Sequence, residues 1–195
     1  RYNIRLAARK GVTVHWSRSE EDLKKFFDLY EITAVRDKIG HRPYEYFKRM
    51  VDAYGSSDLL RIYIAEHEGE PLSGAICIHY GNKTWYIYGA SSNNKRNLMP
   101  NYAMQAEMIR WGFENGSKIY DFGGVFILDK TNGLYKFKEG FCRREGATEF
   151  IGEFDLVYNP LLYTGFAKVL PMMQRRRNRK HQQESVQPAP KQEKE

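Results

Sequence analysis

The sequence predicts an α/β fold in which helices flank a mixed, mostly antiparallel central sheet. Segments with the alternating pattern of strands and segments with helical spacing follow one another along the 195 residues. Three of the strand patterns come in direct succession and are separated only by tight turns, which is typical of an antiparallel meander. Hydrophobic residues make up 42% of the chain and aromatic residues 14%, enough to build the core of one domain.

The first part of the chain predicts helices around a single strand. Residues 1–10 indicate the end of a helix, and alternation over residues 12–16 indicates a strand. Ser19 begins a capping box ahead of an amphipathic helix. Pro43 opens the next helix, which is expected to end near Gly55.

The rest of the chain predicts the remaining strands and two more helices. The expected elements are strands at 59–66, 72–80 and 83–90, a helix at 101–115, strands at 119–122 and 149–156, and a final helix. The expected order of elements is that of the acetyltransferase-like α/β fold called GNAT: a strand, two helices, three meandering strands, a helix and further strands. We therefore expect one GNAT-like domain over residues 1–174.

The positive charge of the chain is concentrated near its C-terminal end. The net charge is +7, and residues 175–195 carry seven Lys or Arg against three Glu. We expect this segment to be a basic, disordered tail that could attract tRNA phosphates or an anionic membrane surface. No apolar run reaches the ~20 residues of a membrane span. Cys77 and Cys142 show neither disulfide nor metal-binding spacing, and no metal site is expected.

Residues 120–156 carry the motifs that indicate chemistry. The sequence Tyr-Asp-Phe-Gly-Gly at 120–124 ends a strand with two glycines, which let backbone approach another group closely. Lys138 follows, between Phe137 and Phe141. A cation in apolar surroundings acts on a bound charge more strongly than it would in water. The pattern indicates a site for an anion, or for negative charge that develops during a reaction.

Three motifs in order resemble the Fem-type peptidyltransferases, the FemABX and MurM-like enzymes. The motifs are YDFGG at 120–124, FKEGF at 137–141 and GEFDLVYNPLLY at 152–163, and the resemblance covers about residues 1–170. These enzymes move amino acids from aminoacyl-tRNA onto peptidoglycan precursors. The resemblance therefore implies an aminoacyltransferase with a GNAT-like fold, which uses aminoacyl-tRNA as its donor and no cofactor.

The resemblance also implies an acceptor and a cellular location. The acceptor would be the stem-peptide amine of UDP-MurNAc-pentapeptide or lipid II, and the transferred residue Ala, Ser or Gly; the sequence leaves both choices open. Such an enzyme is cytoplasmic, and the basic tail would permit peripheral contact with the inner face of the plasma membrane.

The family has two such domains in tandem, and residues 1–5 resemble their junction. This chain is therefore expected to be the second domain without its upstream partner. Residues 18–54 leave no room for the helical-hairpin arm of some staphylococcal relatives.

Two groups of site residues are implied by the resemblance. Lys138 would stabilise negative charge at the acyl centre or on the tRNA end, and the backbone amide near Phe137 would add a second donor. The alternative for Lys138 is an exposed lysine at a strand end. Arg42 and Tyr46 stand four apart on an expected helix and would share a face. Together they suit a diphosphate or carboxylate of the precursor.

The remaining candidates are aromatic or basic residues expected near the same groove. Tyr86 and Tyr88 are expected to point the same way on one strand, and in the family a tyrosine at this place lines the acceptor groove. Simple packing is the alternative. Lys136 and Arg36 complete the expected substrate-binding set. Asp121 is expected to hold the loop after its strand and not to act chemically.

Two other functions remain open from the sequence. The first is a CoA-dependent N-acetyltransferase, which needs a glycine-rich turn whose amides bind the pyrophosphate. Residues 93–100 contain no glycine, and Lys95 and Arg96 there could serve phosphates of tRNA or precursor. The second is a half-domain that binds one substrate and is inactive alone.

Overall fold

The computed structural model describes residues 1–40, 42–125, 127–142, 146–152 and 154–184, with side chains up to residue 173. The chain divides into two compact units, residues 1–147 and residues 148–195. The domain boundary expected at residue 174 stays a prediction.

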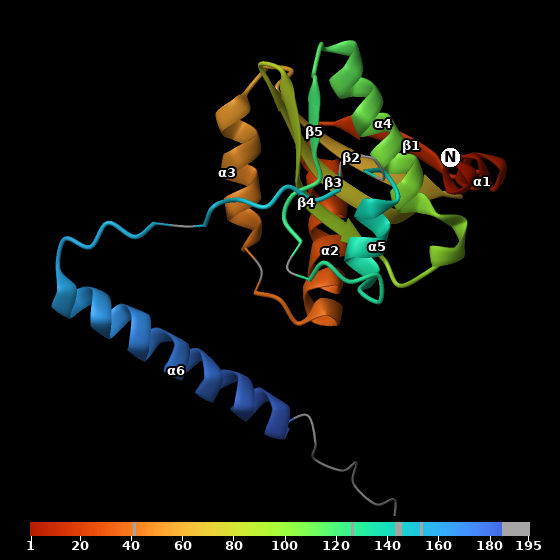
Figure 1. Cartoon of the computed structure of the whole chain (residues 1–195). Helices are drawn as coiled ribbons and strands as arrows, with labels where there is room; N and C mark the ends of the chain where they lie inside the picture. The colour runs from red at the N-terminus through yellow and green to blue at the C-terminus, as the bar shows by residue number, and fades with distance from the viewer. Residues whose placement is uncertain (41, 126, 143–145, 153, 185–195) are drawn as a thin grey trace, which may run out of the picture. The chain divides into compact units, whose positions relative to one another are not determined.

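The first unit is built on a five-stranded sheet in the order β1-β2-β3-β4-β5 (Figure 1). The strands are β1 (Thr13–Ser17), β2 (Leu60–His67), β3 (Glu70–Tyr80), β4 (Lys83–Ser91) and β5 (Ile119–Asp121). The first four are antiparallel neighbours, whereas β5 runs parallel to β4. The predicted mixed, mostly antiparallel sheet with a central meander is confirmed.

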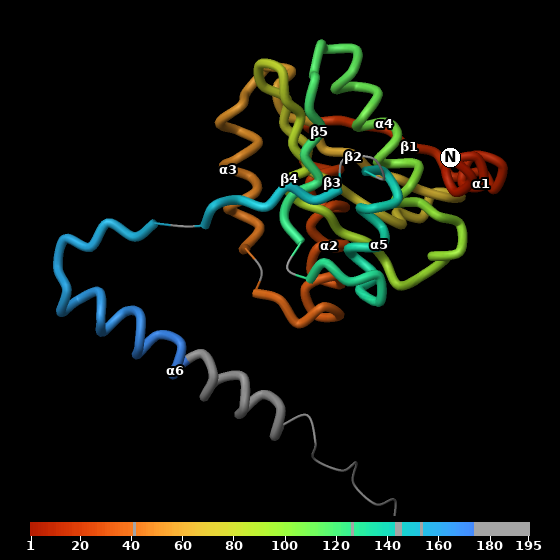
Figure 2. Tube along the Cα trace, in the orientation of Figure 1, coloured from red at the N-terminus to blue at the C-terminus, as the bar shows by residue number. Residues whose placement is uncertain are grey.

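Helices cover both faces of this sheet, as predicted. They are α1 (Tyr2–Arg9), α2 (Glu20–Asp37), α3 (Tyr44–Tyr54), the 3-10 turn η1 (Arg96–Leu98), α4 (Pro100–Glu114) and α5 (Gly133–Glu139). On one face α2 and α3 pack through a cluster that includes Phe26 and Phe47. On the other, α1 and α4 pack through a cluster that includes Ala7 and Met104. The tube in Figure 2 follows the chain through both layers.

The strand predicted at 149–156 is wrong for its described part, residues 149–152 and 154–156, which have no regular structure. The prediction rested on β-forming apolar residues. A strand also needs a neighbour to take its backbone hydrogen bonds, and no described strand pairs with this segment. Large apolar side chains here are exposed instead: Phe150, Ile151, Phe154 and Leu156.

Two helical segments differ from the prediction. Helix α5 was not expected, because seven residues are too few to show helical periodicity. The Asn132 side chain begins it by accepting hydrogen bonds from the N–H groups of Leu134 and Tyr135, both 3.0 Å. The final helix, α6 (Pro160–Glu184), includes residues 175–184 of the segment expected to be disordered. Arg, Lys, Gln and Glu in that stretch are good helix formers.

In the described part of the second unit, residues without regular secondary structure precede α6. Asn159 caps the helix, since its Oδ1 accepts hydrogen bonds from Leu161 N and Leu162 N, both 3.1 Å. The hydroxyl of Tyr163 donates a hydrogen bond to Asp155, so the first turn is tied to the segment before it. None of the helices in the described part of the chain is long and apolar enough to cross a membrane.

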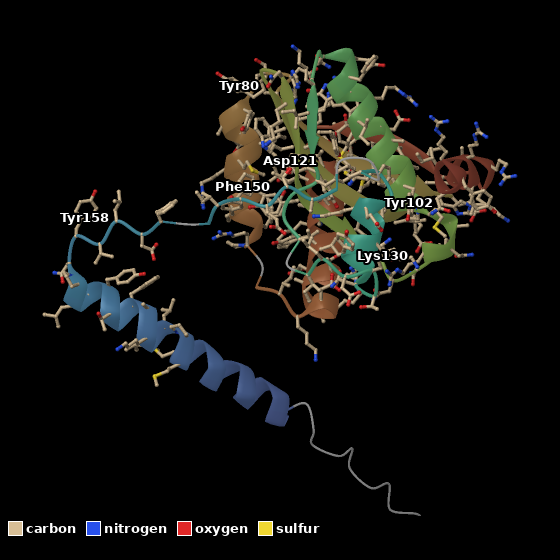
Figure 3. All side chains as sticks on the ribbon, viewed as in Figure 1. Tyr80, Tyr102, Asp121, Lys130, Phe150 and Tyr158 are labelled. Carbon is tan, nitrogen blue, oxygen red and sulfur yellow. The ribbon has the colours of Figure 1, made fainter. Side chains whose placement is uncertain are left out.

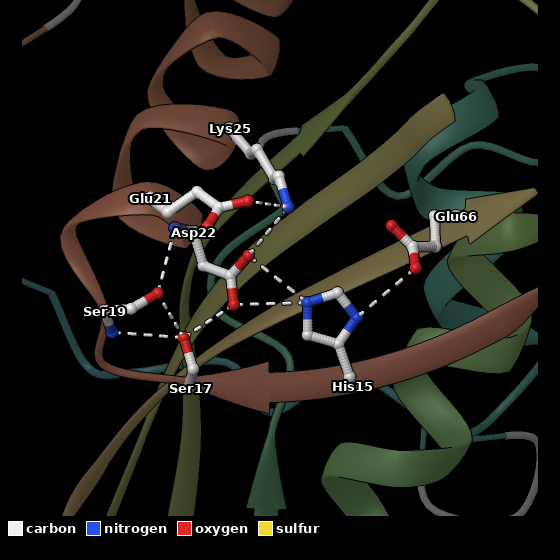
Figure 4. Close-up of polar contacts among 7 residues, drawn as sticks. All are labelled: His15, Ser17, Ser19, Glu21, Asp22, Lys25 and Glu66. Carbon is white, nitrogen blue, oxygen red and sulfur yellow. Dashed lines mark hydrogen bonds and ion pairs between the residues drawn. The ribbon is translucent and has the colours of Figure 1, made fainter. Parts of the chain in front are cut away.

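A polar cluster joins β1 to the start of α2 and to β2 (Figure 4). The carboxylate of Asp22 is buried and accepts a 2.6 Å hydrogen bond from the Ser17 hydroxyl. It also accepts hydrogen bonds of 3.1 and 3.2 Å from Nε2 of His15, whose Nδ1 lies 3.9 Å from Glu66. Burial alone would raise the pKa of Asp22, but the hydrogen bonds from Ser17 and His15 outweigh it, and the pKa lies below its usual value.

Replacing Asp22 by Asn should destabilise the first unit at neutral pH. The change removes a buried carboxylate that accepts several hydrogen bonds, so the free energy of unfolding should fall by about 2 kcal/mol. The folded-state pKa is depressed, so this contribution is present above the unfolded pKa and is lost as pH falls below it. Urea unfolding of both proteins at pH 7 and near pH 3 checks this. The difference between them should shrink at acid pH.

The matched control is Glu21→Gln, which removes an exposed carboxylate from the same helical turn. This variant should unfold close to the unmodified chain at both pH values. An Asp22→Asn effect no larger than the Glu21→Gln effect would contradict the role given to Asp22.

Candidate functional site

Strand β5 forms one edge of the sheet and pairs with β4 over a short distance, and the candidate site lies where that pairing ends. They pair over three residues only, ending with Trp85 opposite Asp121. Strand β4 continues to Ser91, whereas the chain leaves β5 through Phe122, Gly123 and Gly124. Beyond Trp85 the edge of β4 is therefore no longer paired with β5, and the residues that follow β5 turn aside beside it.

Lys138 of α5 binds the turn that follows β5. Its Nζ donates hydrogen bonds to the carbonyl oxygens of Gly123, at 3.2 Å, and Gly124, at 2.9 Å. The side chain is half-buried. Burial lowers the pKa of Lys138, while the charges of Asp121 and Cys142 act in the opposite direction. The expected cation is thus partly buried, on a helix and not at a strand end, and its ammonium lies against two carbonyl oxygens. Within the described residues, two of the three ammonium protons bind carbonyls, and the third has no partner there.

Aromatic rings fix α5 at this place. Phe137 meets Tyr102 of α4 edge to face, with ring centroids 5.0 Å apart. Phe141 stacks on the same tyrosine at 5.6 Å and contacts Phe122 at 5.2 Å. Such ring pairs stabilise packing beyond the area they bury. They hold the helix, and so Lys138, against α4 and the end of β5. Figure 3 labels Tyr102 on α4 and Asp121 at the end of β5.

The backbone amide of Phe137 is less suited to the role expected for it. In an α-helix the N–H of each residue bonds the carbonyl four positions back, and α5 already shows this pattern in the bond from Lys136 N to Asn132 O, 3.0 Å. Phe137 lies inside the same helix, where this pattern uses the backbone N–H groups. We therefore assign Phe137 to holding α5 through its ring and not to donating a second hydrogen bond.

Tyr86 and Tyr88 lie on opposite faces of the sheet, contrary to the prediction that they point the same way. The register between β3 and β4 shifts at Ile76/Cys77, so that Tyr88 lies opposite Ile76 and Tyr86 opposite Cys77. Ile87 is the extra residue of a β-bulge. Tyr86 packs with the α1/α4 cluster and Tyr88 with the α2/α3 cluster. Alternation in the sequence cannot show such a bulge.

Tyr88 joins the pair that was expected to bind the precursor. Its hydroxyl and that of Tyr46 share a hydrogen bond of 3.0 Å, and the guanidinium of Arg42 lies 5.2 Å from the centroid of the Tyr46 ring. Burial, together with the hydrogen bond to Tyr46, raises the pKa of Tyr88 to about 12. Arg42 precedes α3, so it meets Tyr46 by a cation–π contact and not by the helical spacing assumed from the sequence. The exposed guanidinium remains accessible to an anion.

The other basic candidates differ in whether their side chains are already bound to other groups of the protein. Arg36 donates hydrogen bonds to the carbonyl of Ser91, to Asn93 and to Asp37, at 2.9 to 3.1 Å, and thereby ties α2 to the end of β4. Lys95 forms ion pairs with Glu70 at 3.0 Å and Glu68 at 3.5 Å. Lys136 is exposed on α5. Lys136 and Arg42 are therefore better placed than Arg36 or Lys95 to meet phosphate.

Two residues near Lys138 were not singled out from the sequence. Lys83 forms an ion pair with Asp121, with Nζ 2.7 Å from Oδ2, and Tyr102 packs on α5 as described above. The parallel pairing of β4 with β5 brings Lys83 near Asp121, and no local spacing signals that pairing. In the sequence, Lys83 is one lysine at the start of a predicted strand that also contains tyrosines. Such strands are too common to identify a site.

The family model named FemAB matches residues 1–68 and 60–170 of the chain. The chain is 40% identical over 165 residues to the UDP-N-acetylmuramoylpentapeptide-lysine N(6)-alanyltransferase of Weissella viridescens, covering 85% of this chain and 48% of that protein. It is 30% identical over 243 residues to the lipid II:glycine glycyltransferase of Staphylococcus aureus strain USA300, covering 89% and 57%. The second alignment is longer than this chain, so that relative carries residues without a counterpart here. The chain spans about half the length of these relatives.

Solved structures show the same fold. The crystal structure of FemX superposes with a TM-score of 0.63 at 25% identity, covering 71% of this chain and 51% of that one. An aminoglycoside N-acetyltransferase in complex with CoA superposes with a TM-score of 0.57 at 14% identity, covering 75% and 95%. The second likeness concerns the fold alone, and it confirms the GNAT-like architecture predicted from the order of elements.

Replacing Gly89 by Ala should destabilise the protein through Tyr86. A Cβ at Gly89 would lie 1.6 Å from the hydroxyl oxygen of Tyr86 and 2.4 Å from its ring, so the ring must move. Overpacking of this kind costs about 2 kcal/mol. Thermal and urea unfolding measure the loss, which should be much smaller when Gly89→Ala is made together with Tyr86→Leu.

Gly40→Ala serves as control, because a Cβ there meets nothing within 4 Å. If Gly89→Ala were equally costly with Tyr86 and with Leu at position 86, the ring of Tyr86 would not be what requires the glycine.

Proposed function

The chain belongs to the FemAB family, and on that premise we propose that it forms part of a peptidoglycan bridge aminoacyltransferase. The reaction moves Ala, Ser or Gly from aminoacyl-tRNA to the stem-peptide amine of a peptidoglycan precursor. The observation that carries this proposal is the Lys138 ammonium beside β4, which uses two of its three donors within the described part of the chain. The relatives named above act on UDP-N-acetylmuramoylpentapeptide or lipid II, which supports such an acceptor.

The proposed chemistry is the aminolysis of an ester. The acceptor amine attacks the ester carbonyl of aminoacyl-tRNA, a C–N bond forms, and the C–O bond to the tRNA breaks. The amine loses a proton, and the departing tRNA hydroxyl takes one up. The ester is already activated, so alignment of the reactants and stabilisation of the tetrahedral oxyanion are the main requirements. The third proton of the Lys138 ammonium would meet that oxyanion, and no resident cofactor is required.

The acceptor would lie along the Tyr88 side of β4. Both candidate acceptors, UDP-MurNAc-pentapeptide and lipid II, carry a diphosphate, which suits the exposed guanidinium of Arg42. The hydroxyl pair of Tyr46 and Tyr88 holds the ring on which that guanidinium rests. Lys136 would add positive charge on the α5 side, whereas Arg36 would act indirectly by fixing the end of β4.

The proposed partners and location follow from the substrates. Aminoacyl-tRNA is a polyanion, and the basic residues 175–180 provide five positive charges for its phosphates or for anionic lipid. Both substrates are present in the cytoplasm, at the inner face of the plasma membrane in the case of lipid II. We place the protein there, with peripheral membrane contact as part of the proposal.

A second candidate function is a substrate-binding half that is inactive alone. It is favoured by one observation: the chain spans about half the length of its relatives. CoA-dependent acetylation has less support, because residues 93–100 lack glycine and Lys95 is already paired with Glu70 and Glu68.

Transfer from radiolabelled alanyl-, seryl- and glycyl-tRNA to a lysine-containing muropeptide precursor separates these functions. The chain is tested alone and within the longest natural polypeptide that contains it, beside an acetyl-CoA control. Transfer by either form supports the proposal, and transfer by the longer form only identifies this chain as one half of the enzyme. Acetylation, or the absence of any tRNA-dependent product from both forms, would overturn it.

Lys138→Ala should lower kcat in the active form by a factor of about 100 to 1,000, as expected for the loss of one oxyanion donor. The exposed Lys118 provides a matched control, and Lys118→Ala should change kcat little. Steady-state kinetics with each variant provide the test. Normal turnover by Lys138→Ala would exclude the role given to this lysine.

Arg42→Ala should raise the KM for the precursor on the order of tenfold, because it removes a charge-assisted contact with the diphosphate. The KM for aminoacyl-tRNA should stay the same. Arg49→Ala is the control, since Arg49 is an exposed arginine of α3. An unchanged precursor KM in Arg42→Ala would mean that the diphosphate binds elsewhere.

A further inference from the structure

The carboxylate of Asp121 has two partners, one for each oxygen. Oδ1 accepts a 2.7 Å hydrogen bond from the backbone N–H of Gly123. Oδ2 lies 2.7 Å from Nζ of Lys83 on the neighbouring strand. Both charged side chains are about one third exposed or less, Lys83 at 27% and Asp121 at 33%. The contact to Gly123 fixes the turn in which the chain leaves β5, and the contact to Lys83 fixes the carboxylate itself.

The turn that Asp121 fixes is the one that receives the Lys138 ammonium. Gly123 has a φ of +71°, a left-handed conformation that glycine adopts without the strain a Cβ would cause. A Cβ there would lie 3.6 Å from the carbonyl oxygen of Tyr86 and 3.8 Å from Nζ of Lys138, so the turn packs closely between β4 and α5. In this conformation the carbonyls of Gly123 and Gly124 both accept hydrogen bonds from Lys138.

We propose that Asp121 is a positioning residue that determines the place and the electrostatic surroundings of the Lys138 ammonium, and that Lys83 holds Asp121 in position. The inference rests on the proposed function for its catalytic consequence. It is carried by a continuous path of contacts from Lys83 to Asp121, from Asp121 to the amide of Gly123, and from the two glycine carbonyls to Lys138.

The charges around Lys138 determine what each substitution should do. Among the residues that the structure describes, Asp121 on β5 and Cys142 after α5 have charges that act on the ammonium, and Lys83 on β4 pairs with Asp121. Burial would raise the pKa of Asp121, but hydrogen bonds from Lys83 and Gly123 outweigh it and keep the group ionised. Removing the carboxylate charge should therefore lower the pKa of Lys138. Removing Lys83 leaves that charge uncompensated and should raise it.

The first test measures Lys138 directly in the chain as it exists. Competitive labelling of lysines with acetic anhydride across a pH series, followed by peptide mass spectrometry, gives the pKa and the reactivity of the Lys138 amine. Asp121→Asn keeps an oxygen for the Gly123 amide but removes the charge, and the pKa of Lys138 should shift down. Lys83→Gln should shift it up, and the double variant should return towards the unmodified value.

Opposite shifts distinguish positioning from a merely structural role, which would perturb Lys138 in the same direction in both variants. Shifts of the same sign, or no shift in either variant, would overturn the proposal. Circular dichroism confirms that each variant folds. If Asp121→Asn does not fold, Lys83→Gln still decides the matter, because an unchanged or lowered pKa of Lys138 there contradicts the proposal.

The second test concerns turnover in the active form of the enzyme. Asp121→Ala should lower kcat about 100-fold, as expected for a donor displaced by about 1 Å, with little change in either KM, and Asp121→Asn should retain more activity. Failure of the unmodified enzyme to transfer amino acids would overturn the proposed function and leave the labelling result to decide on Asp121. Normal kcat in Asp121→Ala, in an enzyme that does transfer, would overturn the positioning role alone.

Discussion

The short pairing between β4 and β5 is the constraint on which the rest of the site depends. Had the two strands stayed paired to the end of β4, the carbonyls of Gly123 and Gly124 would belong to a regular ladder. Because β5 ends at Asp121, the polar groups that follow need other partners, since backbone groups near the interior are seldom left without one. The Lys138 ammonium donates hydrogen bonds to both carbonyls. The same side chain therefore holds this turn in place and brings positive charge beside β4.

The bulge at Ile87 places a tyrosine of β4 on each face of the sheet. It sends Tyr86 into the α1/α4 cluster, where the ring occupies the space above Gly89, and it sends Tyr88 to the α2/α3 face beside Tyr46 and Arg42. A regular strand would put both tyrosines on one side of the sheet. One extra residue thus separates a packing tyrosine from a tyrosine beside an exposed guanidinium.

Most of the fold could be predicted from the sequence, because the strands and the long helices of the first unit have periodic apolar residues and clear capping signals. The errors concern features that depend on partners far along the chain. The apolar residues at 149–156 suggested a strand, but a strand forms only where another strand accepts it. The facing of Tyr86 and Tyr88 depended on a register shift against β3. The role of Lys83 depended on parallel pairing with β5. Lys138 could be predicted because a lysine between two phenylalanines is visible in the local sequence. Its hydrogen bonds to the carbonyls of Gly123 and Gly124 could not be predicted, because they depend on the fold.

The geometry around residue 138 explains why a lysine suits this position better than an arginine. An ammonium is a compact charge with three donors in a tetrahedral arrangement, so two can bind the diverging carbonyls of Gly123 and Gly124 while the third points elsewhere. A guanidinium is planar and its five donors lie in a rigid fork that matches a single carboxylate or phosphate, so it is less suited than an ammonium to bind two separate carbonyls and a small tetrahedral oxyanion at once. The two glycine carbonyls are therefore part of the site: they hold the lysine without neutralising its charge, and they use two of its three donors within the described residues.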